Sequence, residues 1–455
     1  MKLLARRFRK GTTAMRPLGL DLFAGAGGLS LGFEQAGFDV AGALEIDPIH
    51  CAVHKFNFPT TPVIASPIEK LTAKDVRERL GLGSREVECV FGGPPCQGFS
   101  LIGHRTLDDP RNRLVSHFVE IVAGLGARTF VFENVKGLTV GAHRRFLIEL
   151  VETFDKVGYD VRLPWRVLDA AHYGVPQHRE RLFLLGARKG LAVPEYPSQS
   201  TNPADRPTLL NDLPTGPTCE DAIGDLPNAD AFEALLKGDA VPAVFGDSSE
   251  YARSLRCVDN EGWYFGYKRR WDIHTLTSSA RTIHTAISKR RFRETKPGCV
   301  EPISRFLKLP PFGLSNTLRA GTDGARGAFT SPRPIHYEYS RCITVREMAR
   351  LHGFPDWFRF HATKWHGARQ IGNSVPPPLG RAVAAEVLKA LGATASPAQE
   401  VLDLENTVLL YMEMSEAAEH FGVTAPSGRR DRKSGAKKRK QEEIERARLR
   451  LLRRA

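Results

Sequence analysis

Short apolar segments alternate with helical patterns over the first hundred residues of this 455-residue chain. Residues Leu18–Phe23 form an apolar, strand-like segment, and apolar residues then recur at helical spacing until Gly37. The same pattern predicts further strands at residues 38–44, near 63, and at 88–91, 129–132 and 181–185. Strands that alternate with helices build a parallel, helix-covered sheet. The sequence therefore predicts an α/β fold.

The alternation stops after about residue 188. The following residues are rich in Pro, Gly, Thr, Arg and aromatic side chains and lack long periodic elements, which is typical of an inserted, loop-rich domain. A helical pattern returns after Thr344, where Glu347 completes a capping box. We predict a basic N-terminal extension, a sheet domain in two pieces, the inserted domain, a linker with a small helical segment, and a basic tail, at residues 1–17, 18–189 with 344–392, 190–343, 393–428 and 429–455.

The formal net charge of +14 favours a polyanionic partner. Residues 429–455 hold 13 Lys and Arg against 4 Asp and Glu, although such a charge run can also be merely solvated. The seven cysteines show none of the Cys-x-x-Cys spacings of metal sites, and no apolar run is long enough to cross a membrane. No apolar stretch follows the basic start as it would in a signal peptide. We therefore expect a cytoplasmic protein without a bound metal.

A glycine cluster lies between the first predicted strand and its helix. Gly25 and Gly27 let the backbone approach a ligand closely, and Glu45 ends the next strand, where an acidic side chain can bind a ribose diol. Ser30 stands where dinucleotide enzymes have a third glycine. This departure favours a nucleoside cofactor without a pyrophosphate, such as S-adenosylmethionine, over NAD. The alternative is a tight glycine turn beside a surface glutamate.

Cys96 lies in the string GGPPCQG at residues 92–98, directly after a predicted strand. Glycines permit a sharp turn and prolines fix the backbone φ angle, so the thiol is held rigidly. A rigid thiol suits a nucleophile that must meet one atom of a substrate. A buried, inert cysteine in a Gly/Pro turn is the alternative interpretation.

Six strings of the chain, taken in order, resemble those of the DNA (cytosine-5-)-methyltransferases. They are DLFAGAGG at 21–28, PPCQ at 94–97, ENV at 133–135, QHRER at 177–181, RE with GFP within 346–355, and GNSVP at 372–376. The resemblance implies a Rossmann-like, S-adenosylmethionine-dependent methyltransferase sheet, with the inserted segment as a target-recognition domain. It also implies transfer of a methyl group to C5 of a flipped-out cytosine in a specific sequence of double-stranded DNA.

The resemblance assigns the covalent chemistry to four residues. A thiolate that adds to C6 of cytosine makes C5 nucleophilic, and this attack falls to Cys96. Glu133, if protonated, donates to N3 of the ring, and burial against apolar neighbours can raise its pKa for this task. Arg179 and Arg181 hold the flipped base and its phosphate. The alternative for Glu133 is a buried acid that only pairs with an arginine. The alternative for Arg179 and Arg181 is ordinary ion pairing at the start of a strand.

For the cofactor, the resemblance implies the glycine loop together with Phe23 and Ile46 beside the adenine, Glu45 on the ribose hydroxyls and Asn373 at the methionine end. One departure concerns the aspartate with which the family commonly binds the adenine amino group. Residues 66–68 read Ser-Pro-Ile at that place, and Pro67 cannot make the contact. Either Ser66 replaces the aspartate, or packing and backbone groups hold the adenine.

DNA contacts are expected from the nucleophile loop and from the inserted domain. The residues predicted to contact DNA are Ser100, Arg269, Arg270, Arg291, Thr317, Leu318 and Arg319. A solvated surface is the alternative interpretation of each basic cluster. A DNA-binding relative without activity and a dinucleotide oxidoreductase fit the motifs less well. An RNA-methylating relative shares the motifs, but the large inserted domain and the basic tail favour double-stranded DNA. We expect a monomeric prokaryotic enzyme that acts on nucleoid DNA and protects it from a restriction endonuclease of the same specificity.

Overall fold

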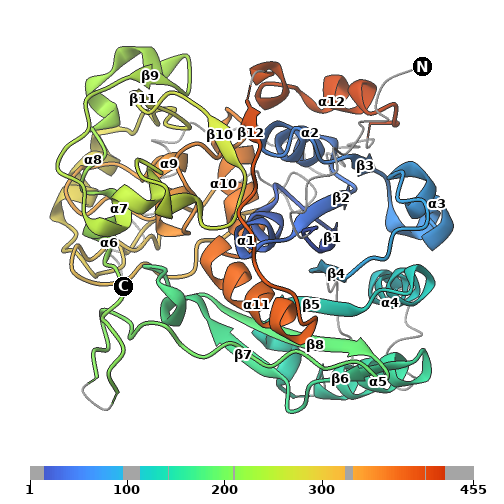
Figure 1. Ribbon diagram of the computed structural model, residues 1–455. Helices are drawn as coiled ribbons and strands as arrows, with labels where there is room; N and C mark the ends of the chain where they lie inside the picture. The colour runs from blue at the N-terminus through green and yellow to red at the C-terminus, as the bar shows by residue number, and fades with distance from the viewer. Residues whose placement is uncertain are drawn as a thin grey trace, which may run out of the picture.

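The computed structural model describes residues 15–95, 113–141, 143–208, 211–322, 331–404 and 406–425. Its centre is an eight-stranded sheet in the order β3-β2-β1-β4-β5-β8-β6, with β7 also paired to β8 (Figure 1). The strands are β1 Leu18–Leu22, β2 Asp39–Glu45, β3 Val63–Ala65, β4 Cys89–Gly92, β5 Thr129–Val135, β6 Tyr159–Val161, β7 Arg166–Asp169 and β8 Glu180–Arg188. Strands β1 to β5 are parallel, whereas β8 runs antiparallel to β5, β6 and β7. The predicted α/β sheet is confirmed, but it is not wholly parallel as expected, because β8 runs against all the other strands.

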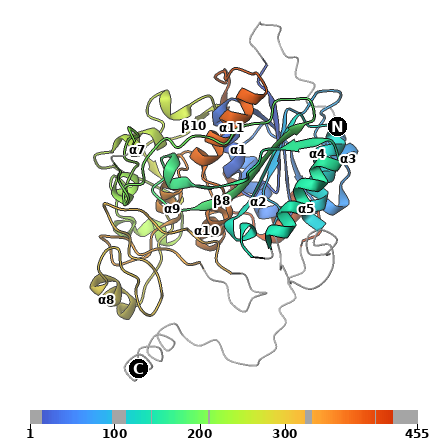
Figure 2. The same cartoon turned by 90° about the horizontal axis from the view of Figure 1, so that it is seen from below.

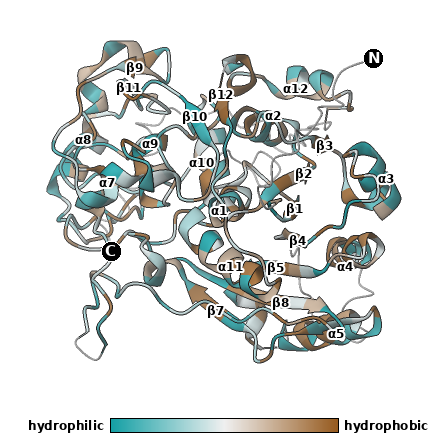
Figure 3. Ribbon diagram, in the orientation of Figure 1, coloured by the Kyte–Doolittle hydropathy of each residue, from teal (hydrophilic) through white to brown (hydrophobic). Residues whose placement is uncertain are grey.

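Helices cover both faces of the sheet. Figure 2 shows α4 and α5 on one side and α1 and α11 on the other. Two separate apolar clusters match this view, because Phe118 and Phe146 pack on one face and Phe33 and Val383 on the other. The sheet strands carry hydrophobic residues, while α3 at the edge is largely hydrophilic (Figure 3). These helices are α1 Gly28–Ala36, α2 Pro48–Asn57, α3 Ala73–Arg79, α4 Arg113–Leu125, α5 His143–Lys156 and α11 Pro377–Ala390.

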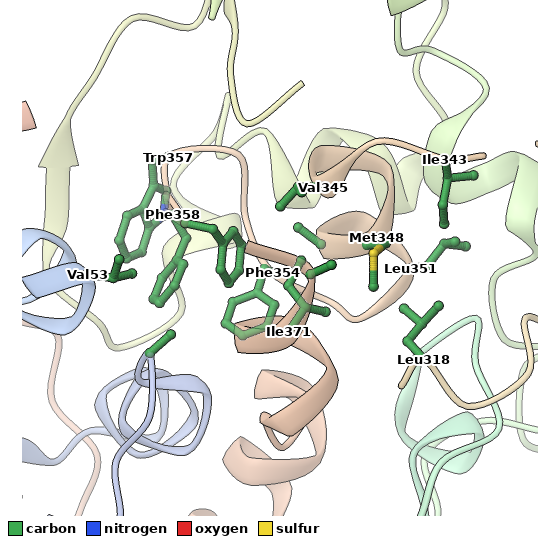
Figure 4. Close-up of a cluster of buried hydrophobic side chains, with 14 of the residues drawn as sticks. Val53, Leu318, Ile343, Val345, Met348, Leu351, Phe354, Trp357, Phe358 and Ile371 are labelled. Atoms are coloured by element: carbon green, nitrogen blue, oxygen red, sulfur yellow. The ribbon is translucent and has the colours of Figure 1, made fainter. Parts of the chain in front are cut away.

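The segment 190–343, which the sequence predicts to be an inserted domain and which is called the second domain below, has little regular structure. It contains α6 Cys219–Ile223, α7 Glu250–Leu255, α8 Ala286–Glu294 and the short paired strands β9 Val241–Pro242 and β11 Thr275–Leu276. Its core is shared with α9 Val345–Leu351 and α10 Lys364–Asn373, whose apolar side chains Figure 4 shows beside Leu318 and Ile343. The predicted capping box of α9 is confirmed, since Thr344 and Glu347 bond each other's backbone N–H groups. Helices α9 and α10 therefore join the two domains.

The segment after α11 is packed and is not the linker that the sequence predicts. Strand β12, Val401–Asp403, pairs with β10, Lys268–Arg270, of the second domain. The chain then continues to α12, Met414–His420, which lies over α2 (Figure 1). Arg16 donates hydrogen bonds to the carbonyls of Phe265 and Ser396 and so ties both pieces to the N-terminal side of the sheet. The segment is a strap across the two domains.

No helix among the described residues is long and apolar enough to cross a membrane. The described residues also hold no group of three or more His, Cys, Asp or Glu side chains suited to a metal ion. The predicted N-terminal extension up to residue 14 and the basic tail 429–455 lie outside the described residues.

Candidate active site

Glu133 lies near the end of β5, beside the point where the chain leaves β4. The parallel register places Gly92 opposite Phe132, so the following turn begins next to Glu133. A Cβ atom added to Gly93 would collide with Oε2 of Glu133, which explains the second glycine of the string GGPP. The Asn134 side chain donates to the carbonyl of Pro94 at 2.9 Å and fixes the start of the loop. Cys96 and Ser100 lie outside the described residues.

Arg181, at the start of β8, pairs with Glu133. Its Nε lies 3.0 Å from Oε1 of Glu133, and the two side chains are only 14% and 12% exposed. Burial raises the pKa of Glu133, and the charges of Arg181 and Arg179 offset only part of this effect. The carboxyl group of Glu133 is therefore paired with an arginine, and its pKa lies above the ordinary value of a glutamate. The pairing with an arginine that the alternative interpretation named is present, and the role of Glu133 as a proton donor stays a prediction.

Arg179 lies at the junction of the two domains, close enough to Glu133 for their charges to interact. Its side chain is buried, and it donates to the carbonyls of Leu318 at 3.0 Å and Gly372 at 2.8 Å. Burial is the main cause that lowers its pKa, and the charge of Arg181 adds to it. The prediction that Arg179 contacts the base or its phosphate is wrong, because the guanidinium already binds the backbone of the second domain and of α10.

A cavity of about 800 Å³ opens beside the carboxyl ends of the first strands. This edge of a parallel sheet is where α/β proteins bind their ligands. The residues that line the cavity include Phe23, Leu44, Glu45, Ile46, Ser66, Pro67, Ile68, Glu69, Pro95, Arg113, Leu114 and His117. Phe23 and Ile46 were predicted to flank an adenine, and both line this cavity. Glu69, which the sequence reasoning missed, adds a second carboxylate to the cavity wall.

Glu45 spans from β2 to the glycine loop. Its Oε2 accepts the Gly25 N–H at 2.8 Å, and its Oε1 accepts the N–H groups of Ile46 and Asp47 at 2.9 Å each. A carboxylate has about four acceptor positions, so this one retains capacity for a ligand hydroxyl. Gly27 has a φ of 100°, and a Cβ there would collide with Phe58. The loop thus requires glycine at this position for its turn and for its close packing.

Ser30 has a structural reason to replace the third glycine of the dinucleotide pattern. Its hydroxyl donates to the buried carboxylate of Asp21 at 2.6 Å and lies 3.1 Å from Nε2 of His54. Burial raises the pKa of Asp21 to about 8, although the Ser30 hydrogen bond lowers it. These buried hydrogen bonds hold the first turn of α1 against β1 and α2, beneath the glycine loop. The sequence reasoning singled out Ser30 but missed both of its partners.

Ser66 and Pro67 occupy the position where the family commonly has its adenine-binding aspartate. Ser66 and Pro67 line the cavity, and the Ser66 hydroxyl already donates to the Pro67 carbonyl at 3.2 Å. Asn373 is exposed at the end of α10 and is not among the side chains that line the cavity in the described structure. The structure therefore brings together Phe23, Glu45 and Ile46, and it leaves Asn373 at the neighbouring domain junction.

Residues 19–389 match the family model of the C-5 cytosine-specific DNA methylases. The chain belongs to this family. The methyltransferase is 54% identical over 411 residues to the type II methyltransferase M.XorII of Xanthomonas oryzae pv. oryzae, covering 90% of this chain and 93% of that protein. It is 34% identical over 377 residues to the type II methyltransferase M1.HphI of Haemophilus parahaemolyticus, covering 81% and 86%.

A solved structure of a prophage-encoded DNA modification methyltransferase from E. coli aligns with a TM-score of 0.66 at 31% identity. The alignment covers 83% of this chain and 99% of that one. The family, the relatives and the fold agree with the resemblance found in the sequence. The chain is therefore a DNA methyltransferase of the C5-cytosine family.

Three predicted DNA contacts of the methyltransferase are wrong because their side chains are occupied or buried. Arg269 is buried, forms a two-oxygen ion pair with Glu34 and lies over the Trp357 ring. Arg291 is 11% exposed and faces the buried Glu301 at 3.7 Å. Leu318 packs in the shared core. A run of basic residues in the sequence shows the local charge, but it does not show which of the side chains are buried.

Two of the other predicted DNA contacts, Arg270 and Arg319, stay accessible to a ligand. Arg270 is 75% exposed, although it pairs with Asp403 at 2.7 Å. Thr317 donates its hydroxyl to the carbonyl of His178 at 2.7 Å, which places the segment 315–319 against the QHRER string. Arg319 is exposed on that segment. Gln177, which the sequence reasoning did not single out, accepts the Leu318 N–H at 2.9 Å and holds the same segment.

Proposed function

We propose that this methyltransferase transfers the methyl group of S-adenosylmethionine to C5 of a cytosine that is flipped out of double-stranded DNA. The observation that carries the proposal is the Glu133–Arg181 pair, at the point where the Cys96 loop leaves the sheet. A nucleoside-sized cavity opens at the neighbouring strand ends. Nucleophile, acid and cofactor would then meet at one edge of the sheet.

Two observations on the wall of the cavity support S-adenosylmethionine as the cofactor. Its wall combines an aromatic ring and an aliphatic side chain, Phe23 and Ile46, on which an adenine can pack. Glu45 is anchored by three backbone N–H groups yet keeps acceptor capacity for ribose hydroxyls. When bound, S-adenosylmethionine supplies an electrophilic methyl group.

The residues of this chain carry the remaining steps. The Cys96 thiolate forms a bond to C6 of cytosine, and the electron pair of the C5–C6 double bond moves into the ring toward N3. Glu133 gives its proton to N3, so that no full charge builds up there. After C5 takes the methyl group, loss of the C5 proton to a base restores the double bond and expels the thiolate. Cys96 and Glu133 are thus regenerated, Glu133 by the return of the N3 proton.

The two oxygens of Glu133 have different surroundings. Oε1 accepts from Nε of Arg181, whereas Oε2 lies toward Gly93 and the turn that leads to Cys96. The proton therefore belongs on Oε2, and Arg181 orients the carboxyl group by holding Oε1. Gly93 leaves the space through which Oε2 can reach a base.

The exposed cations of the second domain are proposed to hold the duplex. Arg270 and Arg319 remain from the sequence prediction, and Lys289, Arg290 and Arg293 project from the exposed side of α8. Such side chains bind phosphates and give affinity that depends on salt. We further propose a monomer in the prokaryotic cytoplasm, paired with a restriction endonuclease, as the names of the type II relatives suggest.

Bisulfite sequencing of DNA from cells that express the chain tests this function. We expect complete protection of cytosine from conversion at one short sequence and none in cells that express Cys96→Ser. Extracted DNA should also resist an endonuclease that cuts the same sequence. Unprotected cytosines in all sequences, with the protein folded and present, would contradict the proposal.

A further inference from the structure

The imidazole of His178 lies between two carboxylates from different parts of the chain. Its Nδ1 is 2.7 Å from Oδ2 of Asp169, at the end of β7. Its Nε2 is 3.0 Å from Oδ2 of Asp205, in the first loop of the second domain. A carboxylate accepts hydrogen bonds and does not donate them, so both ring nitrogens must carry a proton. We call the three side chains the His178 clamp.

The backbone of His178 also holds the segment 315–319, and Asp169 holds the start of β8. The His178 N–H donates to the carbonyl of Ser315 at 3.0 Å, and its own carbonyl accepts the Thr317 hydroxyl at 2.7 Å. The second oxygen of Asp169 accepts the N–H of Arg179 at 2.8 Å. The ring therefore joins the end of β7 to the first loop of the second domain, and the backbone of the same residue holds the segment proposed to approach the DNA.

The charges around the clamp favour the protonated ring. Burial alone would lower the pKa of His178, but the hydrogen bonds and charges of Asp169 and Asp205 outweigh it and raise the pKa. A pocket of about 270 Å³ beside the clamp is lined by Asp169, His172, Glu180 and Arg206 among others, and Glu180 pairs with Lys136. Loss of the His178 proton would turn a nitrogen lone pair toward one of the two carboxylates.

We propose that His178 is a positioning residue: its protonated ring fixes residue 178 between β7 and the second domain, so that the backbone of the same residue holds the segment 315–319 in the arrangement that DNA methylation requires. The proposal rests on the proposed role of that segment at the DNA. Because the group is a cation, its contribution is present at low pH and is lost as the pH rises past the ordinary range of histidine. Deprotonation would weaken DNA engagement first and leave the cofactor cavity unchanged.

Asp205→Asn tests this with a matched control. Asparagine keeps the shape and removes the charge that holds Nε2. Asp212→Asn makes the same change at an exposed position of the same loop. We would follow kcat and the KM for DNA between pH 6 and 10 in both variants and in the wild type. The alkaline rise in KM for DNA should move about 0.5–1 pH unit lower in Asp205→Asn and stay in place in Asp212→Asn.

Two direct readouts make the test decisive. The His178 ring signals in NMR spectra of the full chain should titrate at lower pH in Asp205→Asn, and S-adenosylmethionine affinity by calorimetry should not change. Wild-type and Asp205→Asn profiles that coincide would overturn the proposal, as would a His178 ring that is neutral at pH 6. Failure of the methylation chemistry itself would appear as inactivity at every pH, while the NMR titration and DNA binding would still report on the clamp.

Discussion

Glu133→Gln separates the proton of Glu133 from the shape of its side chain. Glutamine keeps an oxygen that can accept from Nε of Arg181 and places an amide group toward Gly93, so the local packing is preserved. The amide can donate a hydrogen bond but cannot give up a proton to N3. A positioned general acid contributes roughly 10²–10⁴-fold. We therefore expect kcat to fall by this factor, which corresponds to about 2.7–5.4 kcal/mol of barrier.

The pH dependence provides the second half of this prediction. Burial raises the pKa of Glu133, so the active, protonated form is lost as the pH rises through that raised value. The wild-type single-turnover rate should fall on the alkaline side, and Glu133→Gln should lack this limb. Transfer of a labelled methyl group to DNA measures both, with Glu152→Gln, an exposed glutamate of α5, as the control. Turnover within a few-fold of the wild type would refute the role of Glu133.

Arg269→Ala should destabilise the fold by about 3–5 kcal/mol, because it leaves the buried carboxylate of Glu34 without its partner, whereas Arg270→Ala should change chemical denaturation little. Glu45→Ala should weaken S-adenosylmethionine binding by roughly 10–100-fold in calorimetry, the value of one hydrogen bond to a charged group; unchanged affinity would place the ribose elsewhere. Deleting residues 429–455 should leave the methylated sequence unchanged and lower the log–log salt slope of DNA binding by about 0.9 for each phosphate that the tail neutralises, and equal slopes would leave the tail without a role on DNA.

The sheet and its glycine loop could be predicted from the sequence because their signals are local. Strand periodicity, the turn at Gly25 and Gly27, and the helix end at Gly37 depend on neighbouring residues alone. The confirmed capping box of Thr344 and Glu347 is of the same kind. The strings predicted to be catalytic at the ends of β4 and β5 are of the same kind, because a parallel sheet brings those ends together. The QHRER string reaches the same edge because β8 runs antiparallel to β5.

Predictions failed where the decisive partner is distant in the sequence. Arg269 meets Glu34 across 235 positions, and Arg179 meets the carbonyl of Gly372 across 193. Neither interaction leaves a mark in the basic strings from which phosphate binding was inferred. The prediction of a linker after α11 failed for the same reason, because the three residues of β12 pair with β10, a strand of the second domain. Burial of a charge is a property of the assembled fold.

The central claim is that Cys96 attacks C6 of the target cytosine. DNA with 5-fluorocytosine at the methylated position tests it most directly, because fluorine at C5 cannot leave as a proton and the bond to the thiol stays in place. We expect the wild type to form a complex with this DNA that survives denaturing electrophoresis in the presence of S-adenosylmethionine. Cys96→Ser should bind the same DNA and form no such complex, since an alcohol at its ordinary pKa does not replace a thiolate. A stable adduct with Cys96→Ser would contradict the account.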